Sequence, residues 1–347
     1  MKKIIVLFLV LIFSSCQNKI NKTEQIIFAR IEYIFNLKPL IRKQIWSDFD
    51  NKKYDLPLIY YTESSSYITN PTKKFISIFK PKLVFKNKKI KIYKTLKRFD
   101  KNPLHMETAI SGDSKDEYNY HSPFMNCSSY EVVSKNIPDT KSTEYWVTMI
   151  IHEYFHGFQF KHKSYLVSNF TFLSSIPGDS LTKIYEENVW FQKKIKEEND
   201  FLLQAIQSTN KSEITKNINS FFKTRKERRV EFKRRLNFNI DEYEKRLETM
   251  EGTARYVEYK LQIEFATLKL DQKLMNIDTS YHSYKVFKNY KIENDPWLFK
   301  IGKSYFYSTG FNMIRLFDKL KIKYKNRLFN EGNLTLEQLL YTSKQKK

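Results

Sequence analysis

The chain has 347 residues, of which 41% are hydrophobic and 16% are aromatic. This apolar content is sufficient for a large buried core and sets the chain apart from intrinsically disordered proteins. The formal net charge is +23, but the basic residues are dispersed along the sequence and form no known nucleic-acid recognition motif. We therefore expect a folded protein that does not bind nucleic acid.

The amino terminus, residues 1–15, has the pattern of a secretory signal peptide. Two lysines, Lys2 and Lys3, precede an apolar run over residues 4–13. This run is too short for a transmembrane helix, which needs about 20 apolar residues. The small residues before Cys16 resemble a lipobox, which predicts cleavage before Cys16 and lipidation of its thiol and new amino group. An ordinary signal peptide followed by an incidental cysteine is the alternative.

Lipidation of Cys16 predicts an exported protein that is tethered to a membrane. The polar residues 16–24 form the expected tether. By resemblance to the sorting of Gram-negative lipoproteins, Gln17 favours the outer membrane, with the protein facing the periplasm or the cell surface. Cys127 is then the only other cysteine, so no intramolecular disulfide is expected and stability must come from core burial.

The segment 25–165 has mixed α and β patterns and is expected to form one lobe. A helix is predicted over residues 24–38. Three short runs rich in β-branched and aromatic residues, at 57–61, 82–85 and 89–93, predict strands. The lobe is expected to end in a long buried helix.

That helix contains the sequence His-Glu-Tyr-Phe-His at residues 152–156. Ser142 and the acidic residue two positions later are typical of a helix start, and apolar residues follow at helical spacing. Residues four positions apart are stacked on one face of a helix, so His152 and His156 can bind one metal ion while Glu153 lies on the adjacent flank. We interpret the motif as a zinc site. The alternatives are a pair of core histidines whose hydrogen bonds are satisfied by neighbouring residues, or a zinc site that has lost its activity.

Residues 166–347 have long helical patterns and are expected to form a mostly helical lobe. The predicted helices cover residues 183–207, 213–236, 241–268, 307–320 and 336–341. The densest basic run, residues 223–235, falls within the second of them and alternates with apolar residues. We interpret this run as a solvated helix face, with contact to anionic lipid headgroups as the alternative.

Two histidine ligands alone would bind zinc weakly, and two residues compete for the third position. Glu251 shares one face of a predicted helix with Glu258, and Gly252 beside it is small enough for close helix approach. His162 completes the three-histidine spacing of the metzincins, but Gln159 stands where that group has the glycine of a sharp turn. The helix is therefore expected to continue and to leave His162 exposed at its end. Glu251 is preferred, and His162 remains the alternative ligand.

Residues 251–258 read Glu-Gly-Thr-Ala-Arg-Tyr-Val-Glu and resemble the second motif of the gluzincin zinc metallopeptidases, Glu-Gly-x-Ala-x-Tyr-x-Glu. With the His-Glu-x-x-His motif, this resemblance implies a zinc centre with the following roles: His152, His156 and Glu251 as ligands, Glu153 as general base, and Glu258 holding a ligand histidine in place. Met250 replaces the Asn or Asp that often precedes the ligand, and the interval between the motifs is longer than in most gluzincins. An inserted helical segment is expected to fill this interval.

The chain also resembles, more loosely, uncharacterised bacterial zincin-like lipoproteins. The shared markers are a Trp-x-x-Phe-Asp region at residues 46–50, a Tyr-rich segment at 305–310 and a Leu-rich terminal helix at 334–340. The resemblance implies a zincin-like α+β fold. A mixed α/β lobe at the amino terminus would be followed by the zinc-binding helix and then by the helical lobe that carries the third ligand.

The function that these features predict is zinc-dependent hydrolysis of peptide bonds in a peptide or protein substrate. Zinc lowers the pKa of its bound water to about 7, Glu153 accepts the proton, and the hydroxide attacks the carbonyl group. Tyr307 is the candidate donor to the oxyanion, with core packing as the alternative. The rival prediction is a non-enzymatic surface lipoprotein that binds a partner or a glycan on a zincin scaffold, in which zinc is only structural.

Overall fold

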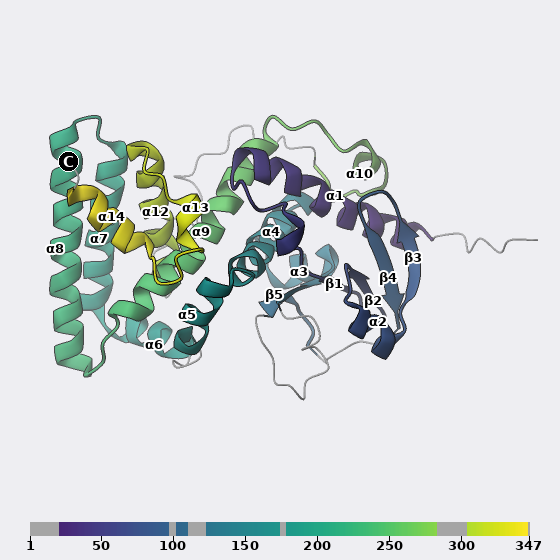
Figure 1. Ribbon diagram of the computed structural model, residues 1–347, viewed down its shortest axis with the longest axis horizontal. Helices are drawn as coiled ribbons and strands as arrows, with labels where there is room; N and C mark the ends of the chain where they lie inside the picture. Colours follow the sequence, from purple (N-terminus) through teal and green to yellow (C-terminus); the bar gives the residue numbers. More distant parts are fainter. Residues whose placement is uncertain (1–20, 97–101, 110–122, 174–177, 283–303, 346–347) are drawn as a thin grey trace, which may run out of the picture.

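The computed structural model describes residues 21–96, 102–109, 123–173, 178–282 and 304–345. The predicted signal peptide and Cys16 lie outside the described residues, so both stay predictions. A part that contains a β-sheet lies on one side of the molecule, and long helices lie on the other (Figure 1). The fold is α+β, as predicted. Among the described helices, none has the length and the apolar character needed to cross a membrane.

The first helix, α1 (Lys22–Gln44), is longer than the helix predicted over residues 24–38. Asn21 caps it, because its side chain accepts a hydrogen bond from the amide of Glu24 at 2.8 Å. The first turn of α1 therefore includes the last residues of the expected tether. At its other end the helix continues through Pro39, just beyond the predicted boundary.

Six strands form one mixed sheet in the order β3-β4-β2-β1-β6-β5. The strands are β1 (Leu58–Tyr61), β2 (Ser66–Thr69), β3 (Lys82–Lys86), β4 (Lys91–Thr95), β5 (Met106–Ala109) and β6 (Phe124–Ser128). Neighbouring strands are antiparallel except β1 and β6, which are parallel. The sequence predicts β1, β3 and β4 correctly. It does not predict β2, β5 and β6.

Both faces of the central strand β1 are covered. The helices of this part are α2 (Lys73–Phe79), α3 (Tyr130–Asn136) and α4 (Thr143–Phe160). Leu58 and Tyr60 belong to the same core cluster as side chains of α1 and α4, whereas Ile59 and Tyr61 pack with Phe75 of α2. Successive side chains of a strand point to opposite faces, so a strand covered on both faces is apolar at every position.

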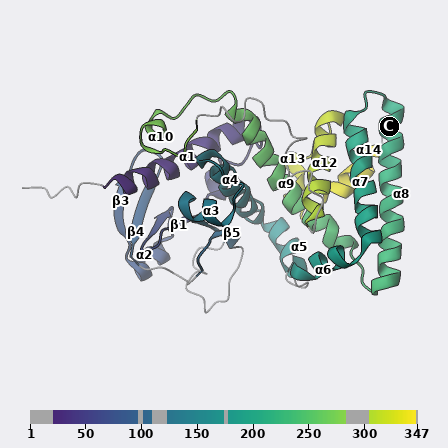
Figure 2. The same cartoon turned by 180° about the vertical axis from the view of Figure 1, so that it is seen from behind.

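The other described helices form most of the second half of the chain. They are α5 (Lys163–Leu173), α6 (Gly178–Glu187), α7 (Val189–Gln207), α8 (Lys211–Leu236), α9 (Asp241–Phe265), α10 (Gln272–Ile277), α12 (Tyr305–Leu320), α13 (Lys325–Leu328) and α14 (Leu336–Gln345). The prediction of one continuous helix over residues 183–207 is wrong in one respect. The backbone is extended at Asn188, which separates α6 from α7. Helices α5 to α8 lie between the two motifs, in the interval where a helical segment was expected. In both views α4 and α9 lie between the sheet and the α7–α8 pair (Figures 1 and 2).

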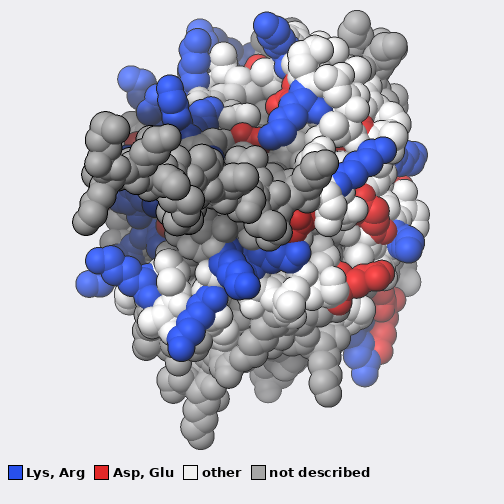
Figure 3. Space-filling model, turned by 90° about the vertical axis from the view of Figure 1, so that its right-hand side faces the viewer, with Lys and Arg blue, Asp and Glu red and all other residues white. Residues whose placement is uncertain are grey.

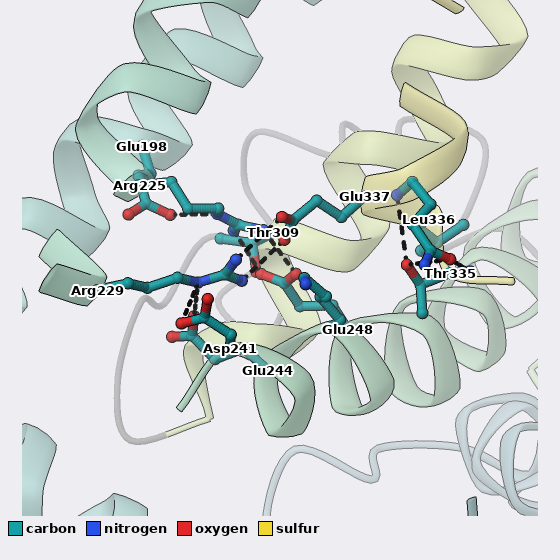
Figure 4. Close-up of polar contacts among 12 residues, drawn as sticks. Glu198, Arg225, Arg229, Asp241, Glu244, Glu248, Thr309, Thr335, Leu336 and Glu337 are labelled. Carbon is teal, nitrogen blue, oxygen red and sulfur yellow. Dashed lines mark hydrogen bonds and ion pairs between the residues drawn. The ribbon is translucent and has the colours of Figure 1, made fainter. Parts of the chain in front are cut away.

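The basic run at residues 223–235 is not simply a solvated helix face. Arg225, Arg228 and Arg229 are buried on the side of α8 that faces α7, α9 and α14. They pair with four glutamates from those helices, and we call the cluster the arginine network: Glu198 of α7, Glu244 and Glu248 of α9, and Glu337 of α14 (Figure 4). The prediction is wrong for these arginines because their partner carboxylates come from distant parts of the sequence.

Helices α9 and α12 cross at two glycines, Gly252 and Gly310. A Cβ atom on Gly252 would lie 2.4 Å from the carbonyl carbon of Gly310, and one on Gly310 would lie 2.1 Å from the carbonyl oxygen of Glu248. These neighbours are backbone atoms, which cannot rotate aside as a side chain can. The close approach expected at Gly252 is confirmed. It brings Glu251 of α9 and Tyr307 of α12 to the same part of the molecule.

Replacement of Gly252 by Ala is expected to lower the free energy of unfolding by about 1–3 kcal/mol, because the added methyl group forces the two helices apart. Gly157→Ala in α4 is the matched control. Its Cβ would meet the Cδ1 atom of Leu56 at 2.6 Å, and this end of a flexible side chain can move. Urea unfolding of the three proteins measures the difference. Equal losses in the two variants would contradict a backbone clash at the crossing.

Candidate metal centre

Helix α4 presents two histidines and a glutamate in one group. The helix begins after Ser142, whose hydroxyl accepts a hydrogen bond from the amide of Tyr145 at 3.4 Å. The Nε2 atoms of His152 and His156 are 3.2 Å apart, and both side chains are buried. Together with Glu153, their ligand atoms lie within 4.8 Å of one another. The group could therefore hold a metal ion, as the His-Glu-x-x-His spacing predicts.

Helix α9 brings Glu251 to the two histidines from a distant part of the chain. Its Oε2 atom lies 3.4 Å from Nε2 of His152 and 3.2 Å from Nε2 of His156, and we call these three atoms the donor triangle. Donors bound tetrahedrally to zinc at about 2.0–2.1 Å are about 3.3 Å apart, so the triangle has the size that zinc requires. The Oε2 atom is also buried and makes no well-formed hydrogen bond to any described residue, which fits an atom that binds a metal.

Gln159 links the two helices that provide these donors. Its Oε1 atom lies 3.0 Å from Nδ1 of His156. Its Nε2 atom donates to the carbonyl oxygen of Met250 at 2.8 Å and to the hydroxyl of Thr253 at 2.6 Å. A hydrogen bond from Nδ1–H to Gln159 leaves Nε2 of His156 free for a metal. The sequence identifies Gln159 only as the residue that replaces a glycine and predicts no role for it in the site. Its position three residues after His156 could have predicted the contact, because residues three apart are neighbours on a helix surface.

Glu258 lies beside the other ring nitrogen of His152. Its Oε2 atom is 3.3 Å from Nδ1 of His152, and Arg255 donates to the same oxygen at 2.6 Å. Burial raises the pKa of the Glu258 carboxyl, but Arg255 and His152 outweigh it, so the pKa is lowered and the group is ionised. A carboxylate in this position can hold the ring with Nε2 available for a metal.

The alternative ligand, His162, lies in a different part of the core. It is buried rather than exposed as expected. Its Nδ1 atom is 2.9 Å from the carbonyl oxygen of Phe158, and its ring stacks on Tyr54 with the ring centres 4.2 Å apart. Within the part of the chain that the structure describes, no hydrogen bond, ion pair or ring contact joins His162 to the donor triangle. The expectation of exposure is wrong because the end of α4 packs against the segment that contains Tyr54.

Glu153 faces the end of the sheet where β5 lies. The backbone amide of Thr108 in β5 donates to Oε2 of Glu153 at 3.2 Å, and the Thr108 hydroxyl donates to the backbone carbonyl of Glu153. Burial raises the pKa of the Glu153 carboxyl, while His156 and His152 oppose the shift. A raised pKa suits a group that takes up and returns a proton near neutral pH. The sequence does not point to Thr108, because its role depends on the position of β5 beside α4.

Tyr307 lies in the first turn of α12 and next to the histidines. Its ring stacks on that of His152 with the ring centres 6.0 Å apart, and the guanidinium carbon of Arg255 is 5.4 Å from its ring centre. Burial and the carboxylate of Glu251 raise the pKa of Tyr307 well above its usual value, so the hydroxyl stays protonated. Tyr305, its neighbour in the predicted segment, donates instead to a glutamate of the arginine network at 2.5 Å.

His156 is expected to release a proton when zinc binds. Burial alone would lower its pKa, but the carboxylate of Glu251 raises the pKa of His156 to about 9. Because zinc requires neutral imidazole, we expect zinc affinity to rise as the pH is raised toward about 9, measured by calorimetry in buffers of different ionisation enthalpy. In the metal-free protein the same group adds stability below its ordinary pKa of 6.5 and loses this contribution as the pH rises through about 9. Zinc affinity that is independent of pH over this range would contradict the expectation.

The structure thus shows a buried His–Glu–His group with HExxH-like spacing, on a helix that follows a sheet-bearing lobe. This group could hold a metal ion. The geometry of the site carries the functional argument, since no family model, no curated protein and no solved structure matches this chain.

Proposed function

We propose that this protein is a zinc-dependent peptidase in which His152, His156 and Glu251 hold the ion. The observation that carries the proposal is the donor triangle, with the carboxylate of Glu153 beside it. Three protein donors leave one coordination position open, as in catalytic zinc sites. Zinc bound there would polarise a carbonyl group and lower the pKa of water to about 7.

Glu153 acts first as general base and then as general acid. Its carboxylate takes a proton from the attacking water and passes it to the leaving amine. The amide of Thr108 keeps this carboxylate oriented from the neighbouring strand. The protonated hydroxyl of Tyr307 is the proposed donor to the oxyanion that forms on the substrate.

The edge of the sheet favours an extended peptide as the substrate. In the described sheet, β5 is the terminal strand and pairs only with β6. An open strand edge can pair with the main chain of a peptide. Since Thr108 of β5 contacts Glu153, a peptide bound along this edge would pass close to the proposed base.

The rival function is that of a non-enzymatic surface lipoprotein that binds a partner or a glycan, with zinc serving only structure. A structural zinc site is closed by four protein donors. His162 is the candidate for a fourth donor, but its ring stacks on Tyr54 and its Nδ1 atom lies beside the carbonyl oxygen of Phe158. This position of His162 favours the enzyme.

We also propose that the protein is exported and is anchored through a lipid on Cys16 to the outer membrane, facing the periplasm or the cell surface. The support is the sequence pattern of residues 1–16. A protein held there would meet peptides and proteins outside the cytoplasm.

Glu153→Gln tests the proposed mechanism. The amide cannot take up the proton, so kcat/KM on a fluorescent casein substrate is expected to fall by about 10²–10⁴-fold while bound zinc is retained. Glu187→Gln in α6 is the control, since Glu187 lies outside both the donor triangle and β5 and its side chain is 60% exposed. Unchanged hydrolysis in Glu153→Gln would remove the proposed base. A zinc-loaded wild type without any hydrolytic activity would favour the rival function.

A further inference from the structure

The most basic part of the chain is a β-hairpin at the end of the sheet opposite β5. Residues 64–99 contain eleven Lys and Arg and no Asp or Glu. Here β3 and β4 form an antiparallel hairpin on which Lys82, Lys86, Lys88 and Lys91 are exposed. Figure 3 looks onto this end of the molecule, where many Lys and Arg side chains are in view.

Among the described residues, no carboxylate neutralises these four lysines. Two glutamates of α1 approach the hairpin, but both have other partners. Glu24 pairs with Lys94 at 2.8 Å, and Glu32 pairs with Lys273. None of the four lysines forms an ion pair with a carboxylate of the described residues. The hairpin therefore presents a positively charged surface.

The register of the hairpin places lysines directly opposite one another. Lys86 is paired with Lys91, and Lys82 with Lys94. At the second pair, Glu24 offsets the charge of Lys94. At the first pair, like charges in cross-strand positions lower stability, and an anionic surface would relieve this cost. Lysines on an edge strand also prevent edge-to-edge aggregation, which accounts for Lys82 and Lys86 in β3. It does not account for Lys88 in the turn or for Lys91 in the inner strand β4.

Two exposed apolar side chains accompany the lysines. Leu83 in β3 is 49% exposed, and Leu96 just beyond β4 is 77% exposed. A surface that combines lysines with leucines suits the interface of a membrane, where the charges meet anionic headgroups and the apolar side chains reach the acyl boundary. Nucleic acid would use the charges but would leave the leucines in water.

The start of α1 lies beside this hairpin. Glu24 in the first turn of α1 makes its ion pair with Lys94 of β4. The five peptide units from Cys16 to Asn21 can span at most about 18 Å. A lipid on Cys16 would therefore keep the hairpin within reach of the membrane surface.

We propose that the hairpin docks on anionic lipid headgroups through the outer edge of β3 and the turn that follows it. We call this edge the hairpin face; its residues are Lys82, Lys86, Lys88, Lys91, Leu83 and Leu96. Lys82 is opposite Lys94 on the side of the sheet that α1 covers, whereas Leu83, Lys86 and Lys91 lie on the other side, so the edge carries charge on both sides. A lipid on Cys16 supplies attachment, and the hairpin face supplies orientation. Strands β3 and β5 are the two ends of the sheet, separated by five interstrand spacings of about 4.8 Å, or about 24 Å. Docking through the hairpin face turns the β5 end, with Glu153, away from the bilayer and toward substrates in solution.

Vesicle binding by the mature chain, residues 16–347 with Cys16→Ser, tests the hairpin face without a lipid anchor. We expect this protein to bind vesicles of phosphatidylcholine with about one-third phosphatidylglycerol and to be released as NaCl is raised. It should not bind phosphatidylcholine alone. Combined Lys→Glu substitution at 82, 86, 88 and 91 is expected to weaken binding at least about tenfold. Circular dichroism melting curves verify that each variant is folded.

A matched variant makes the same change in net charge on the opposite side of the molecule, with Lys→Glu at four exposed positions of α8: Lys211, Lys216, Lys223 and Lys226 (Figure 1). Its binding should stay within about twofold of the parent, because those charges lie far beyond the Debye length from the bilayer. Equal losses in the two variants would reflect net charge alone and overturn the proposal. It would also be overturned if the parent bound duplex DNA but no phosphatidylglycerol vesicles.

A spin label reports the orientation directly. In the Cys16→Ser chain the remaining cysteine, Cys127, is buried, so a nitroxide reagent labels an introduced surface cysteine. On phosphatidylglycerol vesicles, the label at Leu83→Cys should become shielded from a water-soluble nickel complex. The label at Val230→Cys, where the native residue is 62% exposed on α8, should remain accessible. Shielding of the second label in place of the first would overturn the proposed orientation.

Discussion

Glu251→Gln is expected to yield protein without bound zinc, whereas the wild type should purify with one zinc ion per chain. The substitution removes the charged donor of the triangle and leaves two histidines, which bind zinc weakly. Glutamine has nearly the same volume as glutamate, so α9 can keep its packing. Elemental analysis of dialysed protein measures the zinc content.

Two further variants make this result specific. His162→Ala should keep its zinc, because the ring of His162 packs on Tyr54. Glu258→Gln should weaken zinc binding by about 10–100-fold, since it changes the group that holds His152 rather than a donor. Loss of zinc only in His162→Ala would reverse the choice of ligand. Absence of bound zinc in the wild type would contradict the proposal of a zinc-dependent peptidase.

Arg228→Met is expected to lower the free energy of unfolding by about 3–5 kcal/mol. The Arg228 guanidinium donates to Glu198 and Glu244, and all three side chains are fully buried. Methionine has a similar volume, so the variant leaves two buried carboxylates without this cation while the packing changes little. Urea unfolding measures the loss.

Arg234→Met on the same helix is the control for this experiment. Arg234 pairs with Glu231, but its side chain is 67% exposed. Exposed ion pairs contribute little, so we expect a much smaller loss than in Arg228→Met. If Arg228→Met were as mild as Arg234→Met, the buried cluster would not be a major source of stability.

The arginine network bears on the site because it holds the helices that form it. Glu244 and Glu248 lie on α9 together with Glu251, and Thr309 lies on α12 two residues after Tyr307. The Thr309 hydroxyl donates to Glu248 at 2.6 Å, which joins the two helices within the network (Figure 4). Fixing α9 and α12 in this way sets the positions from which Glu251 and Tyr307 reach the histidines.

The sequence by itself determined the parts of the site that depend on local periodicity. A separation of four residues is enough to place His152 and His156 on one face of α4, and seven residues, two helical turns, place Glu251 and Glu258 on one face of α9. The start of α4 at Ser142 follows from the capping preference of serine. The α+β fold and most long helices were also predictable, because local periodicity shows which segments are helices and which are strands.

Only the tertiary structure decided which faces meet. Gln159 contacts α9, Thr108 reaches Glu153 from a strand that was not predicted, and the ring of His162 packs within an aromatic cluster. Three arginines that read as solvent-exposed are buried, because their carboxylates arrive on α7, α9 and α14. Helical and strand periodicity determine which side chains share one face of an element. Which other element packs against that face depends on segments far apart in sequence, and no local pattern records this packing.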